Sequence, residues 1–307
     1  MEFDNNIQFG SREHYFHFMW GYLLPAVNLI INDEESKLSV SATRNKYFFR
    51  SCGPIMDILL NEFLLFHNIN YEIINRDSVN LFDCSRIFVP RWDVWLINLK
   101  KHKNIRSLAR HGKITPNVRG FRNLMIGINV SLFPRQFLSS ISRLRNRVYS
   151  KIDFDSSAIF NKFLGKYLLI KRSSQPDYYK RGGNAEIPTY GSNRRKLMGI
   201  DEAANELQKN NIPVEVFQPG DHSLEDQILA FKACDGVIGI MGAEFSNLIW
   251  MEPNKKVVIF TPKPILDTPP VFKTLAKFMG QIYFEIIPSH HCDNVEIDSE
   301  IVIRALS

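Results

Sequence analysis

The chain has 307 residues, of which 45% are hydrophobic and 23% are charged. This length suits two domains of ordinary size, and this composition excludes a disordered protein. No stretch offers the roughly 18 consecutive apolar residues of a transmembrane helix, and the first residues show no basic segment followed by an apolar run. We therefore expect neither a membrane span nor a signal peptide.

Much of the net charge of +6 lies in two basic clusters, one within residues 135–151 and one within residues 171–196. A basic excess suits nucleic acid, an anionic membrane surface or phosphorylated small ligands. Because no RNA-binding motif is recognisable, we expect no nucleic-acid partner. The four cysteines lie far apart and form no CxxC pair, which is typical of reduced thiols in the cytoplasm and makes a zinc site unexpected.

The first part of the chain alternates between helical and strand patterns, which predicts an N-terminal α/β domain over residues 1–130. An aromatic-rich helix is expected near the start, and Pro25 should kink or end a segment there. The further expected elements are a strand at 37–42, a helix at 53–68, strands at 71–75 and 86–89, and a helix at 93–106.

Residues 131–151 have the pattern of an amphipathic, basic helix. Apolar side chains recur at intervals of three and four residues, at Phe137, Ile141, Leu144 and Val148. We interpret this helix as part of a linker over residues 131–165. The alternative is a helix that lies on an anionic membrane surface.

An acidic triplet, Asp153 to Asp155, follows this helix. In metal-dependent transferases such a triplet follows a strand and binds a divalent ion together with the donor. Because the triplet follows a basic helix here, we interpret it as part of the linker and expect no metal.

From Lys166 onward, short apolar strands alternate regularly with helices. This alternation predicts βαβ units and a parallel sheet with helices on both faces, over residues 166–307. The expected strands are 166–172, 214–219, 236–241, 256–262 and 282–287, and the expected helices are 196–210, 223–234, 244–251, 270–281 and 298–306. In such sheets, ligands bind outside the carboxyl ends of the strands.

Arginines follow the first of these strands. Arg172 lies at the carboxyl end of the strand, and Arg194 and Arg195 lie where the next helix is expected to begin. A guanidinium offers a planar fork of donors to phosphate oxygens, and a helix start adds free backbone N–H groups. These residues therefore predict a diphosphate site.

Two later turns are further candidates for ligand contact. Ser223 and Asp226 form an N-cap pattern, and Glu225 between them either accepts hydrogen bonds from a ribose or complements the helix dipole. Gly242 and Ala243 are small residues at a strand-to-helix turn, where the backbone could approach a phosphate or sugar closely. The chain has no Walker A loop and no GxGxxG motif, which argues against a P-loop kinase and an NAD dehydrogenase.

Several segments, taken in order, resemble glycosyltransferase family 61. They are LLIKR, RRKLMGIDE, SLEDQI, GIMGAEFSNLIWMEP and VVIF, with a second match near the start at HFMWGYLLP, from His17 to Pro25. The resemblance implies a GT-B-like α/β fold with two Rossmann-like domains. It also implies an inverting, metal-independent transfer of a sugar from a nucleotide-sugar donor, with no cofactor.

By analogy with bacterial relatives, the acceptor would be an oligosaccharide or lipid-linked glycan in capsule or lipopolysaccharide synthesis. The protein would then act in the cytoplasm, with a peripheral contact to the inner membrane through its basic surface.

The resemblance also assigns roles to residues. Arg172 and Arg195 would hold the diphosphate, Ser223 and Glu225 would contact the nucleoside, and Gly242, Ala243 and Asn247 would shape the floor under the donor. For the catalytic base, the candidates in order are His17, with His14 on the same helix face as an alternative, then Asp93, then Glu244.

The chain departs from the family pattern at two positions. Met241 replaces the histidine of the family's H-G-A turn, and Gly21 stands where the N-terminal motif has an acid. A methionine cannot donate a hydrogen bond to a phosphate, and the loss of the acid removes one candidate base. These departures favour an alternative function, that of a catalytically impaired subunit that binds a nucleotide sugar or a glycan.

Overall fold

The computed structural model describes residues 2–4, 15–37, 46–74, 86–88, 134–173, 195–262, 271–288 and 294–307. The chain divides into two compact units, Met1–Ile152 and Asp153–Ser307, and each is described by itself below. No helix in the described ranges has both the length and the hydropathy needed to cross a bilayer.

The first unit contains a parallel sheet. Its described strands are β1 (Glu2–Asp4), β2 (Tyr47–Arg50), β3 (Tyr71–Ile74) and β4 (Arg86–Phe88), in the order β3-β2-β1-β4. All three neighbouring pairs run parallel. The strands predicted at 71–75 and 86–89 are confirmed, whereas the helix predicted at 93–106 lies outside the described residues.

The N-terminal helix changes its geometry just before Pro25. α1 (Tyr15–Phe18) continues into the π-helical segment η1 (Met19–Leu23) and then into α2 (Leu24–Lys37). Proline has no N–H to donate to the carbonyl four residues earlier, that of Gly21, so a regular α-helical ladder is interrupted there. The N–H of Leu24 instead donates to the carbonyl of Met19, five residues back. Pro25 was expected to kink or end a segment. In the structure a π-helical turn precedes it, and the helix continues as α2.

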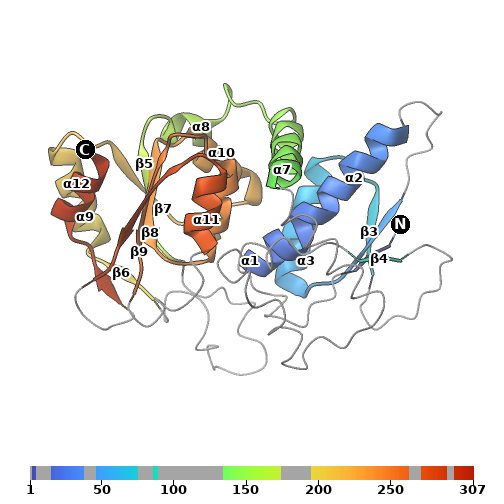
Figure 1. Ribbon diagram of the computed structural model, residues 1–307, viewed down its shortest axis with the longest axis horizontal. Helices are drawn as coiled ribbons and strands as arrows, with labels where there is room; N and C mark the ends of the chain where they lie inside the picture. Colours follow the sequence, from blue (N-terminus) through green and yellow to red (C-terminus); the bar gives the residue numbers. More distant parts are fainter. Residues whose placement is uncertain are drawn as a thin grey trace. The chain divides into compact units, whose positions relative to one another are not determined.

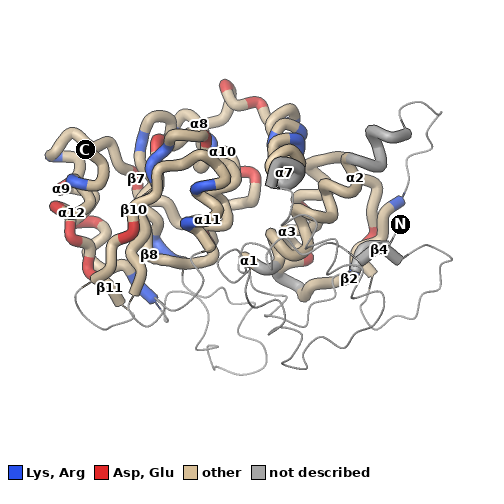
Figure 2. Tube along the Cα trace, in the orientation of Figure 1, with Lys and Arg blue, Asp and Glu red and all other residues tan. Residues whose placement is uncertain are grey.

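Two further helices complete the described part of the first unit, α3 (Pro54–Phe66) and α7 (Pro134–Tyr149). They confirm the helices predicted at 53–68 and 131–151. In α7, the side chains of Ile141, Leu144 and Val148 are buried, and the helix packs against α2. The arginines Arg143, Arg145 and Arg147 recur along α7 (Figure 2).

His67 follows α3 and is buried, with only 5% of its surface exposed. Its ring packs against the rings of Phe63 and Phe66, at centroid distances of 4.5 and 4.9 Å. Burial lowers the pKa of His67 to about 4, and the nearby cations Arg147 and Lys151 add to the effect. The folded protein therefore holds His67 in its neutral form.

We expect the stability of the first unit to fall as the pH falls, because the unfolded chain protonates His67 near pH 6.5 and the folded chain only near pH 4. From pH 8 to pH 5 this single group should cost about 2 kcal/mol of the free energy of unfolding. His67→Leu should remove this component, and urea unfolding at several pH values measures it. Parallel pH dependences of the wild type and the variant would contradict this role.

The second unit contains a larger parallel sheet. Its described strands are β5 (Tyr167–Ile170), β7 (Val214–Phe217), β8 (Gly236–Ile240), β9 (Lys256–Phe260) and β10 (Ile282–Ile286), in the order β10-β9-β8-β5-β7. All neighbouring strands run parallel. The predicted parallel sheet is confirmed.

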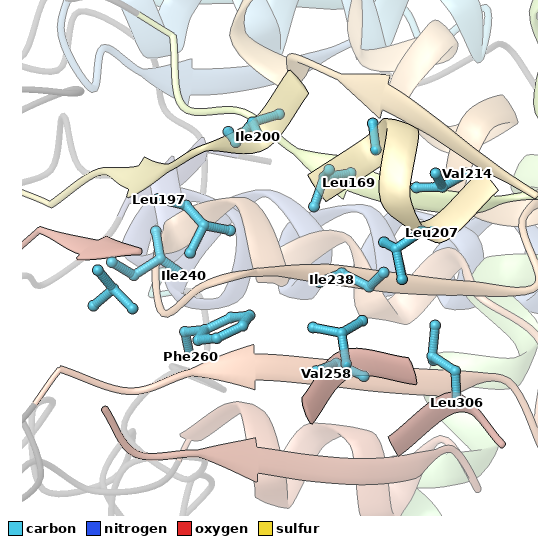
Figure 3. Packing of buried hydrophobic residues seen from close by; sticks show 13 residues of the cluster. Leu169, Leu197, Ile200, Leu207, Val214, Ile238, Ile240, Val258, Phe260 and Leu306 are labelled. Atoms are coloured by element: carbon cyan, nitrogen blue, oxygen red, sulfur yellow. The ribbon is translucent and has the colours of Figure 1, made fainter. Parts of the chain in front are cut away.

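Helices cover both faces of this sheet, as expected (Figure 1). α9 (Ile200–Lys209) and α12 (Ser299–Leu306) lie on one face, and α8 (Ala158–Phe163), α10 (Leu224–Ala233) and α11 (Val271–Phe278) lie on the other. Leu207 and Leu306 from the first pair of helices pack over Leu169, Ile238 and Val258 of the strands (Figure 3). The central strands can be apolar without alternation because neither face meets water.

The helix predicted at 196–210 starts later than expected. Residues Leu197–Met198 form a short strand, β6, which pairs in parallel with β11 (Val295–Glu296). Gly199 then adopts a left-handed conformation with φ 71°, and α9 begins at Ile200. The prediction that Arg195 lies at a helix start was therefore wrong, because a strand and a glycine turn separate it from α9. The segment predicted as a helix at 244–251 is a 3-10 helix, η5 (Ala243–Trp250).

The strand order locates a topological switch point in the second unit. β5 has β7 on one side and β8 on the other, so the chain reverses its direction of winding at the junction of β5 and β8. In open parallel sheets a crevice forms at the carboxyl ends of the strands at such a point, and ligands bind there. The residues that follow Ile170 and Ile240 are therefore the natural place for a site.

Candidate functional site

An arginine and a glutamate meet at this switch point. Arg172 follows β5, Glu244 lies in η5 just after β8, and the Arg172 Nε donates to the Glu244 Oε1 over 3.0 Å. The two side chains are only 12% and 19% exposed. Within the described residues, the Arg172 Nη1 and the Glu244 Oε2 have no hydrogen-bond partner. The pair thus leaves one buried donor and one buried acceptor at the carboxyl edge of the sheet.

Gly242 makes room for this ion pair. A Cβ at this position would lie 2.2 Å from the Glu244 Oε2 and 3.4 Å from the Arg172 Cζ. The backbone of Gly242 is extended, with φ −163°, so the glycine is needed for space and not for its torsion angles. Ala243, the next residue, begins η5 and is partly buried.

Arg195 contacts the same turn. Its Nη1 donates to the carbonyl oxygen of Met241 over 3.1 Å, and the side chain of Met241 is buried. The backbone N–H of Met241 donates to the Phe260 carbonyl, which ties the turn to β9. Two guanidinium groups, those of Arg172 and Arg195, therefore lie at the turn after β8.

Ser173 and Gly220 extend the site toward β7, and sequence reasoning did not name either of them. Gly220 lies in η4 (Pro219–Asp221), and a Cβ there would come within 2.4 Å of the Ser173 Oγ. This hydroxyl is buried and has no hydrogen-bond partner among the described residues. The only sequence signal was that Ser173 directly follows Arg172.

Ser223 and Glu225 lie at the start of α10. The Ser223 Oγ accepts a hydrogen bond from the Asp226 N–H over 3.1 Å, so the predicted N-cap is confirmed. Glu225 is exposed in the first helical turn. Although the residue as a whole is exposed, partial desolvation of its carboxyl and then the neighbouring Asp226 raise the pKa of Glu225. Both residues follow β7, at the same edge of the sheet as Arg172.

Ser223→Ala is expected to cost about 1 kcal/mol of the free energy of unfolding, because the first turn of α10 loses its capping acceptor. Urea unfolding of the wild type and the variant measures this loss. Ser223→Thr is the matched control, since threonine keeps a capping hydroxyl. A loss well below that value for alanine, or an equal loss for threonine, would contradict a capping role.

Asn247 is fully buried in η5. Its Nδ2 donates to the Gln227 Oε1 over 2.8 Å, and Gln227 is itself buried in α10. This hydrogen bond links the 3-10 helix after β8 to the helix after β7. It therefore holds η5 and α10 together at the carboxyl edge of the sheet, on either side of β5.

The remaining candidates belong to other parts of the chain. The side chain of His17, in α1 of the first unit, is outside the described part of the structure, as are Asp93 and Arg194. Gly21 is buried in η1. In the acidic triplet, the Oδ1 of Asp153 accepts from the Ser156 N–H, and hydrogen bonds with Ser156 lower the pKa of this carboxyl. Among the described residues, no group of His, Cys, Asp and Glu is arranged to hold a metal ion.

A parallel α/β sheet with guanidinium groups at its switch point defines a class of domain suited to phosphorylated ligands. The family model described as Glycosyltransferase 61 matches residues 15–258. The chain therefore belongs to this family and is a glycosyltransferase. The resemblance seen in the sequence is confirmed at the level of the family. No curated protein matches the chain.

Proposed function

We propose that the protein is an inverting, metal-independent glycosyltransferase whose second unit binds a nucleotide-sugar donor with its diphosphate at Arg172 and Arg195. The two units would act together in a GT-B-like arrangement, with the acceptor approaching from the first. The acceptor would be an oligosaccharide or lipid-linked glycan of a bacterial surface polysaccharide, such as a capsule or lipopolysaccharide.

The observation that carries the proposal is the position of Arg172. Its guanidinium lies at the carboxyl edge of β5, directly at the switch point between β5 and β8, and its Nη1 is a buried donor without a partner in the described part of the chain. A diphosphate offers oxygens that match such a donor fork. At the neighbouring turn, Gly242 has no side chain, and the Glu244 carboxylate fills the volume that a Cβ would take, 3.4 Å from the Arg172 Cζ.

Arg195 also supports the proposal, because it contacts Met241, the residue that stands where the family pattern has a histidine. Met241 cannot donate a hydrogen bond from its side chain, but its carbonyl accepts from the Arg195 Nη1. A second guanidinium beside this turn could supply the missing phosphate donor. Arginine also carries the positive charge that stabilises the departing diphosphate, in the role that a divalent cation fills in other transferases.

In the proposed reaction, the acceptor hydroxyl oxygen forms a bond to the anomeric carbon while the bond from that carbon to the phosphate oxygen breaks. The bonding electron pair leaves with the nucleoside diphosphate, and a base takes the proton of the hydroxyl. His17, Asp93 and Glu244 remain the candidates for this base. Glu244 is the one whose side chain lies beside the proposed diphosphate site.

The departures at Met241 and Gly21 favour a second candidate function, a subunit that binds a nucleotide sugar without transferring it. One experiment addresses both. UDP, GDP and CMP are titrated into the protein by calorimetry, and sugar nucleotides of the base that binds are then incubated with it to detect slow hydrolysis. We expect binding and slow release of free sugar. Binding without release, even with glycan acceptors added, would support the second function, and no binding at all would contradict both.

A further inference from the structure

We infer that the Glu244 carboxylate occupies the place of the donor's phosphate when no donor is bound, and that the donor must displace it from Arg172. This inference rests on the proposed function, because it concerns how the same site receives its ligand. It makes Glu244 a positioning residue that lowers donor affinity.

The first evidence is the ion pair itself. The Glu244 Oε1 accepts from the Arg172 Nε over 3.0 Å, and both side chains are largely buried. A carboxylate and a phosphate both bind a guanidinium through anionic oxygens, so they compete for the same donors. Arg172 cannot present this edge of its guanidinium to a phosphate while Glu244 holds it.

The second evidence is the space over Gly242. The Glu244 Oε2 lies 2.2 Å from the point where a Cβ of residue 242 would be, so the carboxylate fills the volume that the absent side chain leaves. A small residue at this turn would otherwise let a ligand approach the backbone closely. The Oε2 has no hydrogen-bond partner in the described residues, so within them the carboxylate is bound to Arg172 through its Oε1 alone.

The third evidence is charge. A nucleoside diphosphate bound at Arg172 would lie within a few ångströms of the Glu244 carboxylate, and two anions at such a distance repel strongly in a partly buried site. The carboxylate must therefore rotate away when the donor binds. Once released, it is no longer neutralised by Arg172 and lies beside the donor as a free carboxylate.

Glu244→Gln tests this inference, because glutamine keeps the shape of the side chain and removes its charge. The probes are inorganic pyrophosphate and UDP, titrated by calorimetry into the full-length wild type and variants. We expect the variant to bind both probes roughly tenfold more tightly, since a charge-assisted contact no longer competes with them. Glu300→Gln removes the same charge from a side chain of the same unit that is 87% exposed, and it should stay close to the wild type.

An unchanged or weaker affinity of Glu244→Gln would overturn the inference, because a residue that merely supports Arg172 cannot tighten binding when it is removed. Equal tightening by Glu244→Gln and Glu300→Gln would also overturn it, since the net charge of the unit, and not the contact with Arg172, would then be the cause. Arg172→Ala in the same series separates the two proposals. If pyrophosphate and UDP bind this variant as well as the wild type, or bind no form of the protein, the proposed function itself fails.

Discussion

Arg172→Ala is expected to weaken the binding of the accepted nucleoside diphosphate by about two orders of magnitude, because a partly buried guanidinium makes charge-assisted hydrogen bonds that water replaces poorly. The affinity of Arg172→Lys should lie between those of the wild type and Arg172→Ala, with a loss of about tenfold, since lysine keeps the charge but lacks the planar fork. Calorimetric titration with UDP or GDP measures both losses. Turnover of the sugar nucleotide should fall in the same order.

The alanine variant carries a second effect that has to be separated from binding. Without Arg172, the Glu244 carboxylate stays partly buried without its partner, which destabilises the fold. Arg172→Lys avoids much of this cost because the ammonium can still pair with Glu244. Arg304→Ala is the matched surface control, since Arg304 belongs to the same unit and its side chain is 74% exposed. Affinities within about twofold of the wild type for both Arg172 variants would contradict a diphosphate site at this residue.

Gly242→Ala should destabilise the second unit by about 1 kcal/mol, because the new methyl group would displace the flexible Glu244 carboxylate, 2.2 Å away, from its contact with Arg172. The extended backbone at Gly242 suits alanine, so the cost comes from the side chain of Glu244 and not from the backbone. In a Glu244→Ala background the same change should cost little, since the next contact, to the Arg172 Cζ at 3.4 Å, is close to an ordinary one.

Urea unfolding of the four proteins in this double-mutant cycle measures the coupling between residues 242 and 244. The cycle is informative because each change is small and both residues lie in one turn. An equal cost of Gly242→Ala with and without Glu244 would show that the glycine serves another purpose. A large coupling would confirm that the glycine makes room for the carboxylate.

The sheet of the second unit could be predicted because its strands are short, apolar runs separated by clear helical patterns. Strand ends also identify ligand-binding positions in parallel sheets, which is why Arg172 and Gly242 could be named from the sequence. The N-cap at Ser223 was likewise a local pattern, and local patterns survive into the folded state.

Contacts between distant residues could not be predicted in the same way. β6 exists because Leu197 and Met198 pair with residues almost a hundred positions later, and the Lys196 N–H donates to the Asn294 side chain. That pairing ends the helical pattern at Gly199 and moves the start of α9. The helical propensity of residues 196–210 does not depend on this pairing and therefore could not predict it.

The pairing of Arg172 with Glu244 has the same origin. The two residues are 72 positions apart, and only the adjacency of β5 and β8 brings them together. From the sequence, Gly242 was expected to admit a ligand and Glu244 ranked last among the candidate bases. The structure instead places the Glu244 carboxylate in the space beside Gly242. A donor phosphate would therefore compete with this carboxylate for Arg172.

A crystal structure of the protein soaked with UDP and GDP in turn tests directly whether Arg172 and Arg195 hold the diphosphate of the donor. We expect density for the phosphates of one of them beside Arg172 and Arg195, at the carboxyl edge of β5 and β8, with the Glu244 side chain rotated away from Arg172. Phosphate density at any other place in the protein, with the pair of Arg172 and Glu244 intact, would contradict it.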